Sequence, residues 1–325
     1  MGRGSIFGYF PEVGFDDGVV RVLALLGSIN RRVAVRAQVA HDRIMRESDS
    51  LESFADLSLA RRLERAEAQG NVDFVEARAR IFPDSGAGWI RAAGAYAMFD
   101  GIHSPCTQTF GLGMFEPATT RAMDEIETFF RNHEAPVYHE VTPLADATAL
   151  ALLNERGYQP FEFTSVMFRS LGRGASRNTV PNEGISVRTV AADEYDLWAQ
   201  TSAKGWSELA PHGDFMLEFS RISTNRANGF SFIAELAGQP IATGALNICE
   251  GVALLAGAST VPGGRNQGAQ LALLGARLRH AAEYGCDLAM MCAAPGTASQ
   301  RNAERQGFRI AYTRIKWRLP QGDRA

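Results

Sequence analysis

The chain matches itself at a constant offset of 150 residues, and this internal repeat limits the folds that it can adopt. Ala87-Gly88 aligns with Ala237-Gly238, and after a shared strand–turn–strand pattern Asp100-Gly101 aligns with Glu250-Gly251. Farther on, LNERGY at 153–158 aligns with AERQGF at 303–308, where each segment predicts a helix that ends at a glycine. We therefore expect two related domains in tandem. The alternative is one larger α/β domain in which the matches arose by chance.

Residues 172–184 have the composition of a linker. Their sequence, GRGASRNTVPNEG, is rich in Gly, Ser, Asn and Pro and has no apolar periodicity. A length of 325 residues also suits two domains of about 150 residues each. We place the first domain at 1–172, the linker at 173–184 and the second domain at 185–325.

The second domain contains a strand, a glycine-rich loop and a helix in succession. Val252–Val261 is almost wholly apolar and predicts a central strand, which PGGRNQGAQ at 262–270 and a helix follow. Free backbone N–H groups and the helix dipole form an anion site where such a loop enters a helix. Arg265 adds a positive charge that favours a pyrophosphate. From residue 185 onward the pattern predicts the order β-α-α-β-β-β-α-β-α-β.

These segments resemble the GCN5-related N-acetyltransferase (GNAT) superfamily over about residues 185–319. In that family the acyl-CoA pyrophosphate loop reads Arg/Gln-x-x-Gly-x-Gly/Ala, and RNQGAQ at 265–270 keeps the Arg and the first Gly but ends in Gln270. The segment 299–308 resembles the late helix of the family, which ends in Gly-Phe. The resemblance implies an α/β (α+β) chain of two tandem GNAT-like domains, each with a mixed, mostly antiparallel twisted sheet flanked by helices.

The resemblance also implies a reaction and a cofactor. An acetyl group would pass from acetyl-CoA to a primary amine of a small molecule by direct attack in a ternary complex, without a metal. The strand end would bind the pantetheine arm, and a backbone N–H near Val261 would stabilise the thioester oxyanion. The residues expected to bind the cofactor are Ser259, Thr260, Val261, Arg265, Asn266, Gln267, Gly268, Ala269, Gln270, Asn302 and Arg305.

The sequence departs from the family at the general acid. A Tyr often stands four residues before the Gly of the Gly-Phe pair, and here that residue is Ala303. Tyr312 on the last strand would replace it only if its side chain points into the cleft, and strand alternation leaves both directions open. Ser299 and Asn302 are further donors nearby, and water is an alternative proton source for a thiolate.

No acidic residue lies in the strand where the family sometimes carries a general base. The candidates are therefore Glu208, His212 and Asp214 in a loop, together with Glu250 in a turn; we expect Glu208 and His212 to act. The alternative for each is an ordinary solvated loop residue. Cys292 at a strand end suggests an acyl-enzyme, but buried cysteines are usually inert and direct transfer needs none.

The first domain keeps the elements of the second without its anion loop. The loop falls on Phe115–Thr120, where Pro117 removes an N–H donor and Glu116 would repel a pyrophosphate. We expect a degenerate copy that packs on the catalytic domain and shapes the acceptor cleft. The elements predicted around the loop are a helix at 119–132, a strand at 137–141, a helix at 145–156 and a strand at 161–168, with a strand and a helix expected earlier, at 24–45.

Net charge and composition limit the kinds of partner that we expect for this chain. A net charge of −3 and a pI near 6.1 give no general attraction to nucleic acid or to an anionic membrane. The apolar run at 19–29 is too short to cross a bilayer, and four scattered cysteines favour reduced thiols, so we expect a cytoplasmic location. Two alternatives remain, a protein lysine or N-terminus as acceptor and a non-catalytic acyl-CoA-binding module. The oligomeric state stays open.

Overall fold

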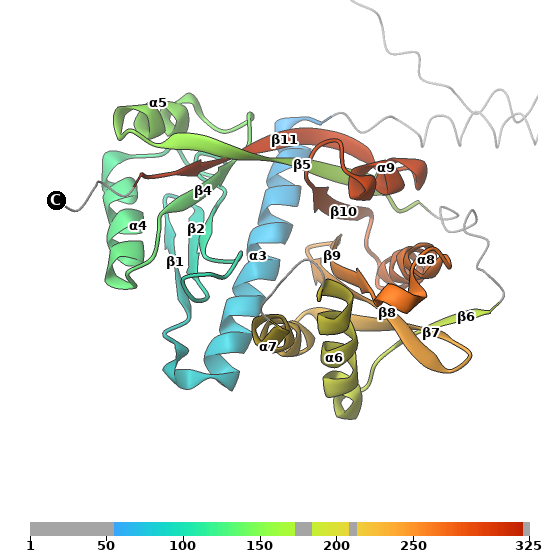
Figure 1. The fold of residues 1–325 in the computed structure, drawn as a ribbon. Coiled ribbons are helices and arrows are strands. Elements are labelled where there is room, and N and C mark those ends of the chain that lie inside the picture. Colours follow the sequence, from blue (N-terminus) through green and yellow to red (C-terminus); the bar gives the residue numbers. More distant parts are fainter. Residues whose placement is uncertain (1–54, 173–183, 208–212, 321–325) are drawn as a thin grey trace, which may run out of the picture. The chain divides into compact units, whose positions relative to one another are not determined.

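A computed structural model describes residues 55–172, 184–207 and 213–320, and the strands in these ranges form one continuous sheet. The sheet order is β1-β2-β3-β4-β11-β5-β10-β9-β8-β7-β6 (Figure 1). The strands are β1 (Gly88–Ala92), β2 (Ala95–Phe99), β3 (Gln108–Phe110), β4 (Tyr138–Val141), β5 (Gln159–Ser170), β6 (Ile185–Thr189), β7 (Gly229–Leu236), β8 (Gln239–Cys249), β9 (Val252–Thr260), β10 (Leu288–Ala293) and β11 (Arg309–Arg318). The helices are α3 (Leu57–Ile81), α4 (Thr120–Asn132), α5 (Ala147–Glu155), α6 (Tyr195–Trp206), α7 (Gly213–Thr224), α8 (Ala269–Glu283) and α9 (Ala298–Arg305).

The predicted fold class is confirmed. All described strand pairs are antiparallel except β3–β4 and β9–β10, and helices flank the sheet. The second copy has the predicted order, β6-α6-α7-β7-β8-β9-α8-β10-α9-β11, and α4, β4, α5 and β5 fall on the segments predicted for the first copy. The strand and helix expected at 24–45 lie outside the described residues. No helix in the described part of the chain combines the length and the apolar character that a membrane span needs.

The two copies exchange their last strands. The strand β5, which ends the first copy, lies between β11 and β10 and pairs with β10 along Ser165–Ser170. The strand β11, which ends the second copy, lies between β4 and β5. Figure 1 shows both strands crossing together from one half of the molecule to the other. Each half of the sheet is therefore completed by the other half of the chain.

A long helix that the sequence analysis did not predict joins the halves. The side chain of Asp56 caps α3 by accepting a hydrogen bond from the N–H of Leu59 (2.8 Å). Leu63 and other residues of the first half of α3 pack on β5, β9, β10 and β11, and Val72 and Val75 farther along it pack on β2 and β3. The helix thus buries one stripe of apolar residues against strands of both copies.

One part of the predicted alignment was wrong. The first hairpin turns at Ala93-Gly94 (φ 45° and 73°), and its counterpart turns at Ala237-Gly238 (φ 50° and 75°), so the constant offset does not hold there. Gly244, aligned with Gly94, lies inside β8. The difference arises because β8 is longer than β2, which moves the turn away from the shared end of the two strands.

Candidate functional site

A divergence between two neighbouring strands creates a cavity in the second copy. The parallel strands β9 and β10 pair over three positions only, Val252–Leu254 with Leu288–Met290. Beyond Leu254, β9 bulges at Gly257 and Ala258, where the register with β8 shifts and Gly257 has a φ of +58°. The strands separate past this point, and the opening holds a cavity of about 870 Å³.

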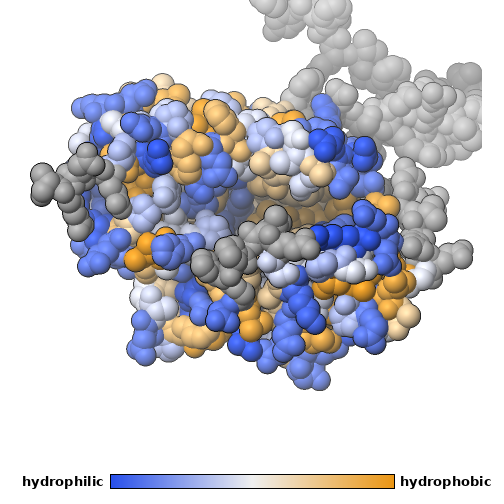
Figure 2. Space-filling model, in the orientation of Figure 1, coloured by the Kyte–Doolittle hydropathy of each residue, from blue (hydrophilic) through white to orange (hydrophobic). Residues whose placement is uncertain are grey.

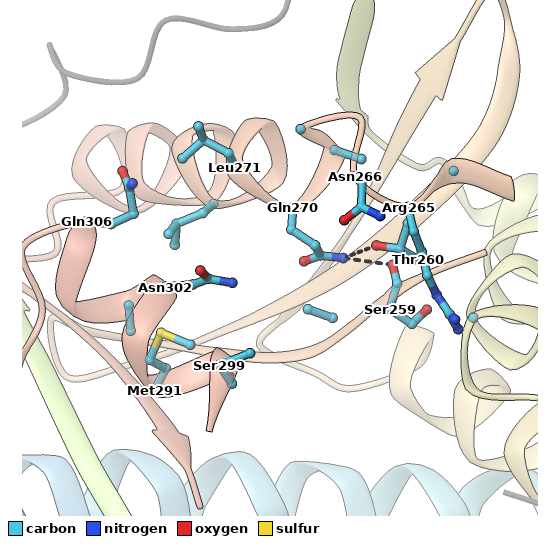
Figure 3. Close-up of a pocket in the computed structure, with 18 of the residues that line it drawn as sticks. Ser259, Thr260, Arg265, Asn266, Gln270, Leu271, Met291, Ser299, Asn302 and Gln306 are labelled. Carbon is cyan, nitrogen blue, oxygen red and sulfur yellow. Dashed lines mark hydrogen bonds between the residues drawn. The ribbon is translucent and has the colours of Figure 1, made fainter. Parts of the chain in front are cut away.

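The cavity is bounded by elements on both sides of the opened sheet. Its walls come from the end of α6, the end of β9, the glycine-rich loop, the first half of α8, Met291 of β10 and α9. Figure 2 shows a hollow with hydrophobic residues at its back between β10 and β9. In Figure 3, Gln270 of α8 and Asn302 of α9 project into the same space from different walls.

The glycine-rich loop presents backbone to one end of this cavity. Gly268 precedes α8 with a φ of +89°, a conformation that a side chain would strain, and it lines the cavity. No side chain among the described residues caps α8. The first N–H groups of a helix have no acceptor within the helix, so this end of the cavity carries the features of an anion site.

Gln270, the departure from the family pattern, has a structural role. Its side-chain amide donates to the carbonyl of Ser259 (2.9 Å) and to the hydroxyl of Thr260 (2.8 Å), as Figure 3 shows. These bonds tie the first turn of α8 to the end of β9. The side chain that replaces Gly or Ala therefore braces the loop across the mouth of the cavity.

Most of the residues expected at the site come together. The cavity is lined by Ser259, Thr260, Arg265, Asn266, Gly268, Ala269, Gln270, Ser299, Asn302 and Arg305. Val261 and Gln267 are not part of this lining. The N–H of Val261 donates to the carbonyl of Ile241 (2.9 Å), so it is not available as an oxyanion donor, and the Gln267 amide donates to Gly263 (2.9 Å). His212 and Glu208 lie outside the described residues.

The structure does not bring Tyr312 to the cavity. Its side chain is buried against α3, and its hydroxyl donates to Oε1 of Glu64 (2.8 Å). Burial raises the pKa of this phenol well above its usual value. The reason is the strand exchange, because β5 lies between β11, which carries Tyr312, and β10, which borders the cavity.

A buried ionic cluster lies behind β10, on the face covered by α3. Arg314 of β11 is fully buried and pairs with Glu67 (2.7 Å), Glu140 (3.1 Å) and Glu64 (3.6 Å). Burial raises the pKa of Glu64 to about 7 and also raises the pKa of Glu67, although Arg314 opposes both shifts. The cluster joins strands of both copies to the helix between them.

Cys292 belongs to this cluster and faces away from α8. Its thiol donates to Oε2 of Glu67 (3.2 Å) and accepts from Nη2 of Arg314 (3.3 Å). Burial and the nearby carboxylate raise the pKa of Cys292 well above its usual value, which disfavours a thiolate nucleophile. Met291, the preceding residue, lines the cavity, so the two side chains lie on opposite faces of β10.

Glu67 was missed by the sequence analysis because it lies in the first copy. Both contacts of its carboxylate go to Oε2, and within the described ranges Oε1 accepts no hydrogen bond. The side chain is 13% exposed, whereas that of Arg314 is 0% exposed. Glu67 is therefore a largely buried carboxylate beside the strand that borders the opening.

Arg277 was also missed, since a long cationic side chain in an amphipathic helix ordinarily points to solvent. In the structure it is 4% exposed and lines the cavity from α8. Its Nη1 donates to the carbonyls of Ala245 (3.1 Å) and Ala256 (3.4 Å), and the guanidinium lies over Gly244. Burial lowers the pKa of Arg277 to about 10, and it remains a cation at neutral pH.

Comparisons with known proteins agree with this geometry. The family model for the acetyltransferase (GNAT) family matches residues 194–308. A GCN5-related N-acetyltransferase from Kribbella flavida is 20% identical, with 80% of this chain and 95% of that chain covered and a TM-score of 0.57. A tandem GNAT protein from the clavulanic acid biosynthesis pathway is 15% identical, with 77% and 89% covered and a TM-score of 0.51.

A third structure, a GCN5-related N-acetyltransferase from Sphaerobacter thermophilus, is 17% identical, with 70% of this chain and 78% of that chain covered and a TM-score of 0.50. No curated protein sequence matches the chain. At these identities the solved structures establish the fold, while the family model identifies the domain that carries the cavity. Residues 194–308 match the model of the acetyltransferase (GNAT) family, and the chain has the fold of tandem GNAT proteins.

Proposed function

We propose that this chain is an N-acyltransferase that moves an acyl group from a CoA thioester to a primary amine of a small molecule, by direct attack in a ternary complex. Acetyl-CoA is the donor that the family implies. The observation that carries the proposal is the divergence of β9 from β10, followed at once by the glycine-rich loop at the start of α8. These two features give one cavity an anion-binding end and an opened strand edge.

The two ends of the cavity suit different parts of the donor. The N–H groups at the start of α8, together with Arg265, would bind the pyrophosphate. The pantetheine arm would then lie along the end of β9 toward the bulge. Gly257 and Ala258 have no paired residue on β8, so their N–H groups replace that of Val261 as the proposed oxyanion donors.

The leaving thiolate needs a proton source. Ala303 is buried in the core of the second copy and offers none, whereas Ser299 and Asn302 line the cavity from the same helix. We assign to these two side chains the binding of a water molecule that protonates the thiolate. Tyr312 has no part in this step, since its hydroxyl is committed to Glu64.

Glu67 is the described carboxylate that suits the role of general base. It contacts Cys292, where β10 has separated from β9, from the face of the sheet opposite α8. Burial raises the pKa of Glu67, which makes it a stronger base than an exposed carboxylate. Oε1 would accept one proton from the acceptor ammonium, and the freed nitrogen lone pair would form the C–N bond as the C–S bond breaks. The second proton that the nitrogen loses would pass through the bound water to the leaving thiolate. His212 and Glu208 remain candidates from the sequence.

Contacts around Phe115 support the proposal that the first copy binds no cofactor. Phe115 occupies the segment equivalent to the anion loop, with Arg65 over its ring (5.1 Å) and the Tyr96 ring at 6.4 Å. A Cβ added at Gly94 or Gly111 would come within 2.7 Å of Phe115, which shows how tightly the ring is packed. We therefore assign the first copy a structural role, with one contribution to the chemistry through Glu67 of α3.

Calorimetry with CoA and acetyl-CoA tests the proposal. We expect one site per chain in the native protein and at least about tenfold weaker binding in Arg265→Glu, because a charge-assisted bond to phosphate becomes a repulsion. Arg279→Glu is the matched control, since Arg279 is exposed on the same helix and does not line the cavity. Absence of binding to the native protein would refute the proposal. Two sites per chain would refute the assignment of a cofactor-free first copy.

A further inference from the structure

Arg277 is a buried cation without an anionic partner in the described part of the chain. Its hydrogen-bond acceptors are backbone carbonyl groups: Nη1 donates to Ala245 and Ala256, and Nε donates to Leu273 (3.4 Å). Nη2 donates to no acceptor among the described residues. Burial is the sole cause that lowers its pKa, so no described carboxylate compensates its charge. A buried charge of this kind is costly unless a ligand or a counter-ion completes it.

The position of Arg277 within the cavity decides which part of a donor it would meet. It lies eight residues beyond Ala269, the first residue of α8, which corresponds to about 12 Å along the helix axis. The phosphates of a donor bound at the loop would therefore be about two turns away. Ala256, whose carbonyl accepts from Nη1, immediately precedes the bulge and follows the last β9–β10 pair at Leu254. Arg277 thus lies beside the bulge of β9, where the acyl group would lie.

The surroundings make room for this side chain. The guanidinium lies over Gly244, and a Cβ there would come within 3.0 Å of the guanidinium carbon. An alanine at this position would crowd the group that lines the cavity. The carbonyls of β8 and β9 hold the cation, and Gly244 leaves space for it. Leu274 and Met291 are apolar residues of the same cavity lining.

We propose that Arg277 selects acyl donors whose acyl group ends in a carboxylate, the monothioesters of dicarboxylic acids such as succinyl-CoA, by pairing Nη2 with that carboxylate. The inference rests on the proposed function and narrows its donor. The terminal carboxylate takes no part in the chemistry. The amine nitrogen still forms the C–N bond as the C–S bond breaks, the thiolate takes one proton, and the product is an amide with a free carboxylate.

Two donors with four-carbon acyl groups test the inference without knowledge of the acceptor. Succinyl-CoA and butyryl-CoA differ at the end of the acyl chain, a carboxylate in one and a methyl group in the other. We expect calorimetry to show that the native protein binds succinyl-CoA about tenfold or more tightly than butyryl-CoA, as a hydrogen bond to a charged group implies. Arg277→Met should remove the preference and Arg277→Lys should retain part of it, while Arg279→Met should leave it unchanged.

Each outcome separates this inference from the proposed function. If the native protein binds neither CoA nor any thioester, the proposed function fails. If it binds CoA but does not prefer succinyl-CoA over butyryl-CoA, the inference alone is overturned, and this result does not depend on the folding of any variant. The inference is also overturned if Arg277→Met, shown to be folded by circular dichroism, binds CoA, butyryl-CoA and succinyl-CoA more weakly by the same factor. Arg277 would then support the cavity or bind the part that the three ligands share.

Discussion

Replacing Glu64 with Gln should make the stability of this protein less dependent on pH. Glu64 is 1% exposed, its Oε1 accepts from Tyr312, and its Oε2 has no hydrogen-bond partner among the described residues. The amide of Gln has nearly the shape of a protonated carboxyl group. Glu64→Gln therefore imitates the neutral form of Glu64 at every pH and keeps an oxygen that accepts from Tyr312.

The magnitude follows from the pKa of Glu64. Burial raises this pKa from 4.5 to about 7. Because the folded protein holds the proton more tightly than the unfolded chain, the contribution of Glu64 to stability is greatest below pH 4.5 and is lost as the pH rises through 7. A difference of about 2.5 pKa units corresponds to about 3 kcal/mol. The free energy of unfolding of Glu64→Gln, relative to that of the native protein, should rise by about this amount between pH 4.5 and pH 8.

Urea unfolding at pH 5, 6, 7 and 8, followed by circular dichroism, measures this change. Glu125→Gln is the control, because Glu125 is exposed on α4 and should show no pH-dependent difference from the native protein. A difference between Glu64→Gln and the native protein that stays constant over this range would refute the reasoning. It would mean that Arg314 holds Glu64 ionised despite its burial.

Two further predictions concern catalysis and the exchanged strands. Glu67→Gln should lower the rate of acyl transfer by about 10²–10⁴-fold and leave CoA binding unchanged, measured in a thiol-release assay with any amine that the native protein accepts. Glu76→Gln on the same helix is the control. An unaltered rate in Glu67→Gln would exclude Glu67 as the base. A chain of residues 184–320 alone lacks β5 and leaves an edge of β10 unpaired, so it should bind no CoA by calorimetry unless residues 55–172 are added. Full binding by the isolated half would show that the exchanged strand is dispensable.

Local patterns in the sequence were sufficient to predict most helices and strands of the second copy and the residues at one end of the cavity. The run of small and apolar residues in β9, the glycines of the following loop and the apolar face of α8 are signals contained within about 30 residues. The loop residues Arg265 and Gly268 line the cavity for this reason. The fold class follows from the same local patterns and from the repeat.

The tertiary structure decided which strands pair, and with them the surroundings of the catalytic candidates. Strands β5 and β11 have corresponding positions in the repeat, and no pattern within either one states which half of the sheet it joins, because strand pairing depends on distant contacts. Their exchange removes Tyr312 from the cavity, and α3 of the first copy brings Glu67 to β10. The burial of Arg277 likewise depends on the packing of α8 over Gly244, which amphipathic periodicity alone does not reveal.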